Sequence, residues 1–432
     1  MNIRLPDEVK YIITTLEENG HEAYAVGGCI RDAVLSIEPK DWDICTSALP
    51  EQTMKVFKES RIIETGLKHG TITLILNNKH FEITTYHCSN KLISSLKEDL
   101  SRRDFTINAM AYNPRTGIVD FFGGVSDINN QIIRCTQGAD ERLKEDALRI
   151  IRALRFASVS GFKIEDATSE AIFRNKGLLK NIAVERISVE LNKMIAGANV
   201  GDILLRFTPV ISEIIPEIND MIGFEQNNPY HYLDVWKHTV RSITKAPEDV
   251  VLRLTMLFHD IGKPGCYTEA DGIGHFYGHQ KVSRAMAEEI LLRLKYDNDT
   301  ISAVTELVLY HDADVNLKGK NIKRWLNRLG EERLRQLIEI KRADAMAQSE
   351  KSRKIKIGKL YEILLKIDEI IEQQQCFSLK DLAINGRDLI KAGVPQGREI
   401  GKVLNYLLDM VIDGQIENDK EKLLETAKNF LQ

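Results

Sequence analysis

The fold is decided by two short stretches near the start of the chain, Val26-Gly27-Gly28-Cys29-Ile30-Arg31-Asp32 and Lys40-Asp41-Trp42-Asp43-Ile44. The two glycines stand between an apolar run and a helical stretch, so backbone N–H groups and a helix start can approach a phosphate closely. Asp41 and Asp43 lie two residues apart in an expected strand, and their carboxylates should therefore leave the same face. This layout suits two Mg²⁺ ions held between a nucleoside triphosphate and an attacking hydroxyl.

The composition is that of an ordinary globular protein. The 432 residues are enough for two to four domains, and 43% of them are hydrophobic and 28% charged. The six cysteines are scattered and never form a C-x-x-C pair, which predicts free thiols in a reducing compartment, without a disulfide framework or a cysteine zinc site. No window reaches 18 apolar residues, and no basic segment precedes an apolar run at the start. We therefore expect a cytoplasmic protein with no membrane partner.

Charge is distributed unevenly along the chain. The net charge of −4 at pH 7 argues against a general nucleic-acid binder, but residues 318–358 contain 13 Lys and Arg against five Asp and Glu. Such a basic surface can follow a phosphate backbone. The same pattern is equally typical of a solvated helix face, and both interpretations stay open at this point.

The first 135 residues predict an α+β head. Apolar residues recur at helical spacing in residues 5–16, and short strand-like runs follow. We expect a small mixed or antiparallel sheet with helices, its strands at 23–26, 41–46, 61–65, 71–76, 81–86 and, ending in a turn, 117–124. Asn77-Asn78 joins two of them like a hairpin. Glu82 lies on one strand and either joins Asp41 and Asp43 as a third carboxylate or is a plain exposed residue.

An arginine-rich loop precedes an apolar segment in residues 101–112, which read SRRDFTINAMAY. Arg103 is placed to reach a triphosphate. Asp104 and Asn108 can brace the loop beneath it by hydrogen bonds.

From residue 140 the apolar periodicity becomes helical and stays so almost to the end. Asp146, Arg149, Arg152 and Arg155 recur every three residues, which predicts one stripe along a single helix, facing a cleft or water. An Asp beside an Arg is an acceptor–donor template. Cytosine and adenine offer an amino donor beside ring acceptors, whereas uracil and guanine would oppose a carbonyl to the carboxylate, at a cost of roughly 1–3 kcal/mol. The alternative is a stripe that serves only solubility.

A second constellation lies between residues 231 and 344, where six of the ten histidines fall. Imidazole and carboxylate are good ligands for Mn, Fe, Ni or Zn, so this set is expected to hold one or two divalent transition-metal ions. Its candidate ligands are His238, His259, Asp260, His279, His311 and Asp344, with Asp312 next to them in sequence.

These motifs occur in a known order. GGCIRD, DWD, RRDFTINA and EDALRIIRALRF resemble the class II tRNA nucleotidyltransferases, the bacterial CCA-adding enzymes and their poly(A) polymerase relatives. The tail, LAINGRDLI and then GKVLNYLLDMVIDGQIEN, is also similar to that family, and the middle resembles an inserted HD phosphohydrolase domain. The resemblance implies a nucleotidyltransferase head (1–135), a helical neck and body with the template (136–225), a helical HD-type metal-binding domain (226–350) and a helical tRNA-binding tail (351–432).

The resemblance also implies roles for the candidate residues. Asp41 and Asp43 would bind Mg²⁺ and Arg103 would contact the nucleotide; with Glu82, which its strand position alone suggests, they form the expected catalytic set. Nucleotide binding is expected of Gly28, Arg31, Arg103, Asp146, Arg149, Arg152 and Arg155, with Asp146 and Arg149 as the base template. The HD ligands would be His238, His259, Asp260 and Asp344, with His279 and His311 as additional ligands.

One departure bears on the product. Before the RRDF motif, family members usually carry a flexible segment of the form D-G-x-Y-x-D-x-R-R-P. Here Thr85-Tyr86-His87 is followed only by CSNKLI before SSLKEDLSRRDF. In the family this segment is tied to the switch from C to A incorporation, and members that lack it resemble the CC-adding enzymes. Adenine is larger than cytosine, so the template must shift slightly before the pocket accepts it. Without the segment that moves the template, cytosine should fit the pocket and adenine should fit poorly.

We therefore expect template-independent transfer of CMP residues (CC) from CTP to the 3′ end of tRNA, with pyrophosphate release and a two-Mg²⁺ mechanism. A complete CCA-adding enzyme that uses CTP and ATP is the first alternative. Less favoured alternatives are a poly(A) polymerase, a metal-dependent phosphohydrolase whose main activity is the HD module, and a non-catalytic RNA-binding scaffold. The intact acidic and template pairs disfavour the last two.

Overall fold

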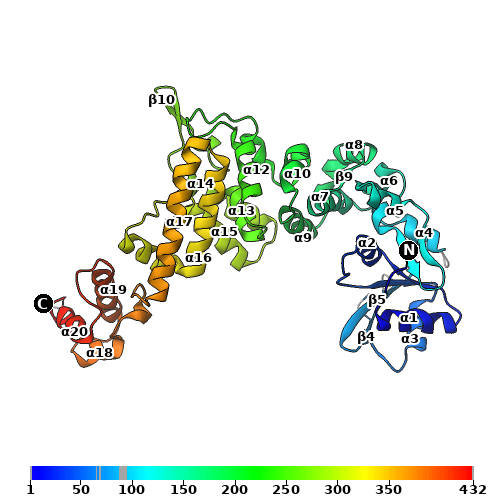
Figure 1. Cartoon of the computed structure of the whole chain (residues 1–432), viewed down its shortest axis with the longest axis horizontal. Coiled ribbons are helices and arrows are strands. Elements are labelled where there is room, and N and C mark those ends of the chain that lie inside the picture. Colours follow the sequence, from blue (N-terminus) through cyan, green and yellow to red (C-terminus); the bar gives the residue numbers. More distant parts are fainter. Residues whose placement is uncertain (1, 65, 68–69, 87–94, 431–432) are drawn as a thin grey trace. The chain divides into compact units, whose positions relative to one another are not determined.

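The computed structural model describes residues 2–64, 66–67, 70–86 and 95–430 (Figure 1). They form two compact units. The first runs to Asn199 and also takes in Arg206–Ile214, and the second consists of Val200–Leu205 and the chain from Ile215 onward. None of the described helices is both long enough and apolar enough to cross a membrane.

The first unit opens with the α+β head. Its helices are α1 (Asp7–Glu18), α2 (Gly28–Val34), α3 (Pro50–Val56), α4 (Leu96–Ser101) and α5 (Gly124–Asn129). Its strands are β1 (Ala23–Val26), β2 (Asp43–Thr46), β3 (Arg61–Ile63), β4 (Thr71–Leu76), β5 (Lys79–Thr85), β6 (Met110–Asn113) and β7 (Gly117–Asp120). The α1 helix buries its apolar stripe and packs beside α3. The α+β head is therefore confirmed.

The head is built on a seven-stranded sheet in the order β3-β4-β5-β2-β1-β6-β7. Strands β2 and β5 are parallel and all other neighbours are antiparallel, so the prediction of a small mixed sheet is confirmed. The β4–β5 hairpin turns through Asn77 and Asn78, whose φ angles of 49° and 59° are those that a two-residue hairpin requires.

Strand β2 positions the acidic residues. Asp43 is paired with Val26 of β1 on one side and with Glu82 of β5 on the other. The strand begins at Asp43, so the predicted strand at 41–46 is two residues too long and Asp41 lies before it. The partner strand β1 ends at Val26 because Gly27, at φ 80°, turns the chain away, and residues 41–42 therefore have no strand to pair with.

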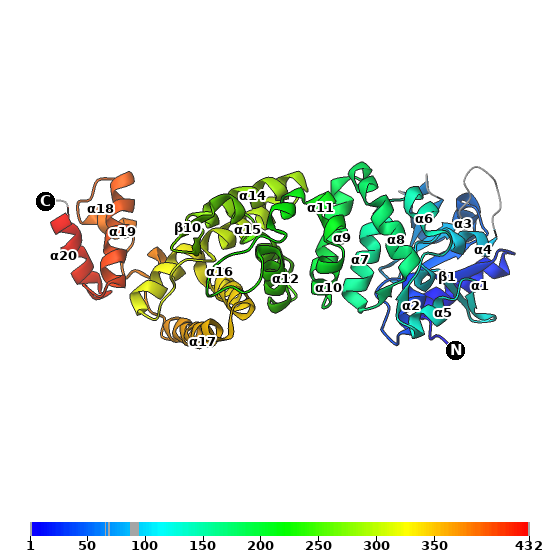
Figure 2. The ribbon, with the colours of Figure 1, turned by 90° about the horizontal axis from the view of Figure 1, so that it is seen from above.

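The rest of the first unit is mostly helical. It comprises β8 (Ile132–Ile133), α6 (Ala139–Glu145), α7 (Leu148–Ser160), β9 (Lys163–Ile164), α8 (Asp166–Asn175), α9 (Val184–Ile195) and α11 (Thr208–Ile214), while α10 (Val200–Arg206) lies at the division between the units. Helices α7 and α9 lie side by side (Figure 2).

The prediction that residues 146–155 share a single helix is wrong. Asp146 ends α6 in an extended conformation, with φ −145° and ψ 99°. Its carboxylate accepts a hydrogen bond of 3.2 Å from the backbone N–H of Leu148, the first residue of α7. An Asp side chain can satisfy an N–H at a helix start in this way, and this local bond competes with continuing the helix.

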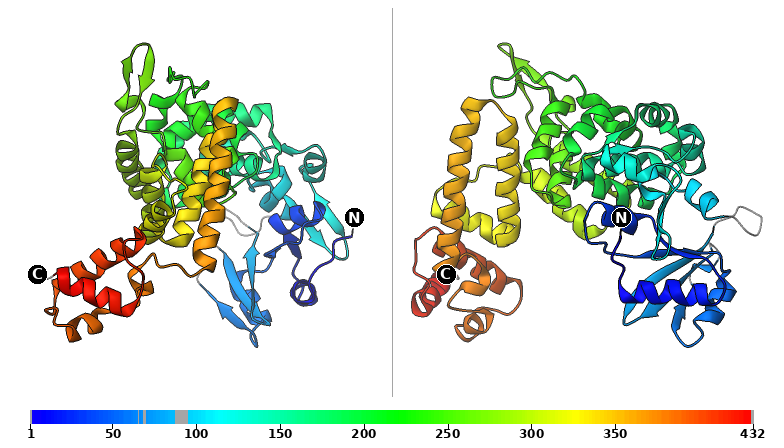
Figure 3. Two further views of the ribbon diagram at one scale, coloured as in Figure 1. Left: turned by 60° about the vertical axis from the view of Figure 1, so that its left-hand side comes forward. Right: turned by 45° about the vertical axis from the view of Figure 1, so that its right-hand side comes forward.

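The second unit is predominantly helical, as predicted. Its helices are α12 (Val235–Lys245), α13 (Val250–Phe258), α14 (His279–Arg293), α15 (Asn298–Tyr310), α16 (Gly319–Ala347), α17 (Glu350–Glu372), α18 (Gly386–Lys391), α19 (Arg398–Ile412) and α20 (Lys420–Phe430). Helices α16 and α17 lie side by side (Figure 3). The hairpin of β10 (Thr268–Ala270) and β11 (Ile273–His275) was not predicted, because three-residue strands are too short to display an alternating pattern.

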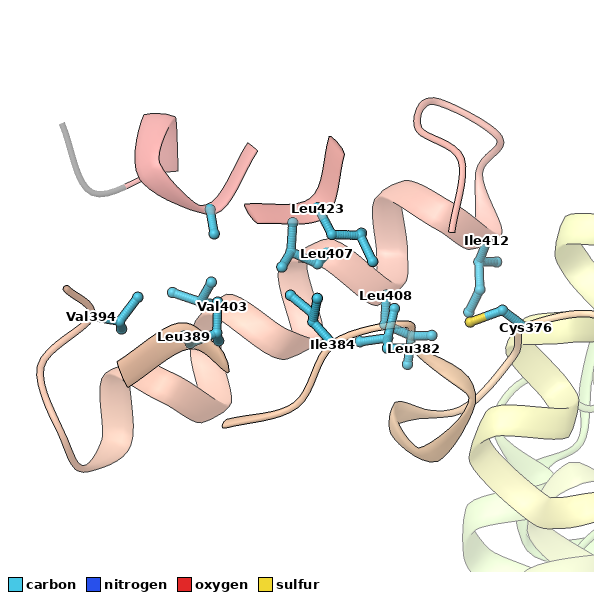
Figure 4. Close-up of a cluster of buried hydrophobic side chains, with 11 residues drawn as sticks. Cys376, Leu382, Ile384, Leu389, Val394, Val403, Leu407, Leu408, Ile412 and Leu423 are labelled. Atoms are coloured by element: carbon cyan, nitrogen blue, oxygen red, sulfur yellow. The ribbon is translucent and has the colours of Figure 1, made fainter. Parts of the chain in front are cut away.

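The C-terminal helices α18 to α20 have a core of their own (Figure 4). Leu389, Val403, Leu407 and Leu423 are fully or almost fully buried in it. Burying side chains of this size stabilises a segment by about 1.5–3 kcal/mol each. This core holds the short helices of the tail together.

Candidate functional site

A cavity of about 420 Å³ in the first unit brings most of the predicted head and template residues together. We call it the arginine cavity; it is lined by Gly27, Gly28, Arg31, Asp43, Arg103, Asp104, Asn108, Asp146, Arg149, Arg152, Arg155 and Phe156. Five of these residues are arginines and three are aspartates, so the lining favours an anion. The volume is in the range of small-ligand pockets.

Asp43 stands at the acidic edge of the arginine cavity. Partial removal from water raises the pKa of Asp43; Arg103 opposes this rise, and the carboxylates of Glu82 and Asp41 add to it. A divalent cation would relieve this repulsion, and an all-oxygen donor set is the one that Mg²⁺ prefers. Asp41 and Glu82 do not line the cavity, and among the described residues these three carboxylates do not form a group whose ligand atoms lie within 4.8 Å of one another.

The glycine turn and two arginines form the next part of the lining. The positive φ of Gly27, 80°, favours glycine at this position, and a Cβ atom there would lie 2.6 Å from Nη1 of Arg103 and displace this guanidinium. Arg31 donates from Nε and Nη2 to Oδ1 of Asp32, at 2.9 and 2.7 Å, and from Nη1 to Asn108 at 2.7 Å. The guanidinium of Arg31 is therefore held in the wall of the arginine cavity before any ligand binds.

The predicted template pair meets in the cavity although its two members belong to different elements. Arg149 donates to the carbonyl oxygens of Arg102 at 2.7 Å and Arg142 at 2.9 Å, and to the carboxylate of Glu145 at 3.2 Å. Asp146 accepts from Arg186 of α9 at 3.0 Å. A hydrogen-bond acceptor, Asp146, and a hydrogen-bond donor, Arg149, thus both line the arginine cavity.

The other two arginines of α7 are held by buried acids. Arg152 donates to Oδ2 of Asp104 from Nε at 3.0 Å and Nη2 at 2.6 Å, and its Nη1 donates to Glu190 of α9 at 3.3 Å. Arg155 forms an ion pair of 2.7 Å with the same Glu190. Burial acts to raise the pKa of Asp104, but Arg152 and Asn108 outweigh it and hold this pKa below its ordinary value. Asp104 is therefore an internal anion that orients Arg152.

The second candidate site is a cluster of buried side chains in the second unit. The His–Asp cluster comprises His238 of α12, His259 at the end of α13, Asp260, His279 of α14, His311 at the end of α15 and Asp344 of α16. Ligand atoms lie within 4.8 Å of one another in two groups, His238/His259/Asp344 and Asp260/His279/His311. Five helices therefore deliver all six predicted ligands to the wall of one cavity or next to it, and that cavity measures about 340 Å³.

The histidines of the cluster are oriented as metal ligands. The Nδ1 atoms of His259, His279 and His311 lie 2.7, 2.8 and 2.7 Å from backbone carbonyl oxygens. A carbonyl only accepts, so each Nδ1 carries a proton, and in the neutral ring each Nε2 presents a lone pair. The Nε2 atoms of His279 and His311 are 3.2 Å apart. Two lone pairs this close repel each other unless a cation lies near them.

The electrostatics of the cluster also call for positive charge. Burial lowers the pKa of His311 to about 3, so this ring is neutral at pH 7, as a ligand must be. Burial acts in the same direction on His259, but the Asp260 carboxylate outweighs it and raises the pKa of His259. One or two divalent ions fit this donor set of imidazole and carboxylate.

Comparison with known proteins identifies the family. The family models described as "Poly A polymerase head domain", "Probable RNA and SrmB- binding site of polymerase A" and tRNA nucleotidyltransferase domain 2 match residues 23–134, 161–222 and 267–427. The CCA-adding enzyme of Ligilactobacillus salivarius is 30% identical over 99% of this chain and 98% of its own length. That of Levilactobacillus brevis is 32% identical over 97% and 98%.

The chain belongs to the CCA-adding enzyme family. It is accordingly a nucleotidyltransferase, as the order of its motifs implied.

Solved CCA-adding enzymes have the same fold. The enzyme of Bacillus stearothermophilus in complex with CTP is 28% identical, covers 98% of this chain and 96% of its own, and superposes with a TM-score of 0.70. The enzyme of Thermotoga maritima complexed with tRNA is 22% identical over 99% and 97%, with a TM-score of 0.64. The predicted fold class is confirmed by these neighbours.

Two residues of α9 at the site of this CCA-adding enzyme homologue were not predicted from the sequence. Glu190 binds Arg152 and Arg155, and Arg186 binds Asp146. A signal for Glu190 was present: it stands three residues after Ile187 and four before Met194, on the buried face of the helix. A carboxylate on an apolar face needs a cationic partner, and the arginines of α7 are such partners.

Proposed function

We propose that the chain transfers CMP from CTP to the 3′-hydroxyl group of tRNA, with release of pyrophosphate. The observation that carries this proposal is the arginine cavity, because one space is lined by the acid of β2, four arginines and the template pair of Asp146 and Arg149. The 28% identity to an enzyme solved with CTP supports the choice of nucleotide.

Each group has a task that its chemistry suits. Asp41, Asp43 and Glu82 would hold two Mg²⁺ ions, which would supply activation of the RNA hydroxyl and neutralisation of the departing pyrophosphate. Arg31, Arg103, Arg152 and Arg155 bind the triphosphate. Because most of these guanidinium groups are already fixed by hydrogen bonds and ion pairs, little reorganisation accompanies binding. Catalysis is then positioning plus charge stabilisation.

Asp146 and Arg149 select the base. The carboxylate accepts from the exocyclic amino group, and the guanidinium donates to the neighbouring ring acceptors. A carbonyl in the place of the amino group would leave two acceptors opposed.

The product we propose is CC, with A left to another enzyme. The support is the sequence before the RRDF motif, where the acidic-then-basic segment is missing; residues 87–94 of this link lie outside the described residues. A second candidate is complete CCA addition, which is favoured by the names of relatives that match almost the whole chain.

Sequencing of reaction products tests both candidates. A tRNA that ends at the discriminator base is incubated with CTP, ATP and Mg²⁺, and its 3′ ends are sequenced. Ends in CC support our first candidate and ends in CCA the second, while long A-only tails or unextended tRNA would contradict both. Asp41→Ala serves as the control for head activity.

We also propose that the His–Asp cluster is a divalent-metal phosphohydrolase centre. Its support is the pair of ligand groups and the inward-facing Nε2 atoms. A bound divalent ion would supply a nucleophile from water at neutral pH. The test is hydrolysis of p-nitrophenyl phosphate with Mn²⁺, Ni²⁺ or Zn²⁺, compared with His259→Ala. Equal rates in the two proteins, or none with any of these metals, would contradict this assignment.

The tRNA is proposed to follow the helical part of the chain by phosphate contacts. The support is the surplus of Lys and Arg in residues 318–358, which belong to α16 and α17 and the turns beside them. Recognition by backbone and shape suits an enzyme that must accept every tRNA.

A further inference from the structure

We propose that Arg186 of α9 is a positioning residue that sets the choice of base by fixing the carboxylate of Asp146. This inference rests on the proposed function, since it needs Asp146 to face the incoming base. It concerns a residue that lies outside the lining of the arginine cavity.

Two contacts define the orientation of the Asp146 carboxylate. Nη2 of Arg186 donates to Oδ2 at 3.0 Å, and the backbone N–H of Leu148 donates to Oδ1 at 3.2 Å. Because both oxygens are held, the plane of the carboxylate is fixed. Each carboxylate oxygen can accept more than one hydrogen bond, so a base amino group can still bind beside these two donors.

Asp146 needs this external support because of where it lies. It falls between α6 and α7 in an extended conformation, and about a third of its side chain is exposed (34%). No helical packing restricts its rotamer there. Arg149, by contrast, is only 15% exposed and is held by Arg102 and by two residues of α6. The donor half of the template is therefore fixed without α9, whereas the acceptor half depends on it.

Two charged residues of α9 each contact side chains of the opposite charge in the template region. Arg186 contacts Asp146, and Glu190, one helical turn later, contacts Arg152 and Arg155. Residues four apart lie on the same face of a helix. Since α9 packs along α7 (Figure 2), one rigid element supports both the base-selecting and the triphosphate-binding parts of the cavity.

Loss of Arg186 should therefore relax selectivity more than it slows the reaction. A carboxylate that is free to rotate no longer enforces a donor opposite it, so a uracil carbonyl is rejected less strictly. We expect Arg186→Ala to lower the ratio of kcat/KM for CTP over UTP by at least about tenfold, mainly through KM for CTP.

The experiment measures CTP and UTP incorporation into tRNA that lacks its 3′ end, for the wild type, Arg186→Ala, Arg186→Lys and Asp146→Ala. Arg174→Ala is the matched control, because Arg174 is equally exposed (54% against 53%) and forms an ion pair of 2.7 Å with Asp140. Thermal unfolding of each variant excludes a folding defect. We expect Lys at position 186 to restore part of the selectivity and Arg174→Ala to leave it unchanged.

A double variant tests whether Arg186 acts through Asp146. If it does, Arg186→Ala adds nothing to the selectivity loss of Asp146→Ala. Unchanged selectivity in folded Arg186→Ala, or additive losses in the double variant, would overturn the inference and leave the proposed function intact. Unchanged selectivity in Asp146→Ala would instead overturn the template on which the proposed function depends.

Discussion

In the arginine cavity five arginines face three aspartates, whereas in the His–Asp cluster four imidazoles face two aspartates and each other. The arginines are held by acids that lie partly outside the cavity, such as Glu190. Three of the four histidines are held by backbone carbonyls, which fix their rings but supply no charge. The first site therefore presents guanidinium groups that carboxylates hold in fixed positions, and the second presents lone pairs.

The difference indicates what each site binds. A fixed array of guanidinium groups suits a polyphosphate, because the donors are in place before the ligand arrives. A set of lone pairs that converge at 3.2 Å suits a cation, because only positive charge between them relieves the repulsion. If this comparison is right, changes in one site should leave the chemistry of the other intact.

The largest expected effect is in the head. Asp43→Asn removes the acid that both lines the arginine cavity and neighbours Glu82. In the proposed mechanism Asp43 holds the catalytic ions, and loss of such a ligand is worth several kcal/mol, so we expect CMP transfer to fall by about 10³-fold, as measured with radiolabelled CTP. Metal bound to the His–Asp cluster should be unchanged.

A second substitution in the head, Glu82→Gln, tests the third carboxylate, and Asp7→Asn is its control. Glu82 is paired in register with Asp43, and we expect its variant to lose about 10–100-fold in transfer. Asp7 is almost fully exposed at the start of α1, and its variant should keep full activity. Wild-type activity in Glu82→Gln would make Glu82 a plain exposed residue.

The next substitution alters the His–Asp cluster and should leave the activity of the arginine cavity unchanged. Asp260 lies within 3.1–3.8 Å of all four histidine Nε2 atoms of the cluster. Asp260→Asn should weaken metal binding by more than the roughly 10–100-fold that outer-shell changes cause, while CMP transfer stays at the wild-type rate. Metal binding is measured as metal content by mass spectrometry after dialysis, and CMP transfer is measured with radiolabelled CTP. A parallel loss of transfer would mean that the two sites are not independent.

The sequence was a better guide to which residues line the two cavities than to the elements and partners that position those residues. Spacing was enough to nominate Asp43, Arg149 and the six cluster ligands, because glycine turns, Asp pairs and His-Asp doublets are local patterns. It placed Asp146 on the wrong element, since a helix break caused by a side-chain bond to Leu148 leaves no mark in apolar periodicity. Arg186 was missed for a different reason: its partner is 40 residues away, and only the packing of α9 on α7 brings the two together.

A smaller effect concerns the internal anions of the arginine cavity. Asp104 is buried, so water hardly stabilises its charge. Arg152 instead stabilises the carboxylate and holds its pKa below the ordinary value. Asp104→Asn should lower the free energy of unfolding by about 1–3 kcal/mol at pH 7, measured by urea unfolding. The folded-state pKa is depressed, so this stabilisation is present above the unfolded pKa and is lost as the pH falls through the folded value. The difference between the two proteins should therefore narrow below about pH 4. A constant difference from pH 7 to pH 3 would mean that Asp104 acts through shape and not charge.

The smallest effect should come from the basic surface of residues 318–358. Lys320 is exposed at the start of α16. If it contacts a tRNA phosphate, Lys320→Ala removes about one released counterion, so the slope of log affinity against log salt should fall by about 0.7–0.9. Affinity at fixed salt should fall only a few-fold, and equally for different tRNAs. Lys10→Ala, whose ammonium is already paired with Asp7 at 3.1 Å, is the control and should leave the slope unchanged. An unchanged slope in Lys320→Ala would favour the solvated-face interpretation for this position, because a lysine that water alone surrounds releases no counterion when RNA binds.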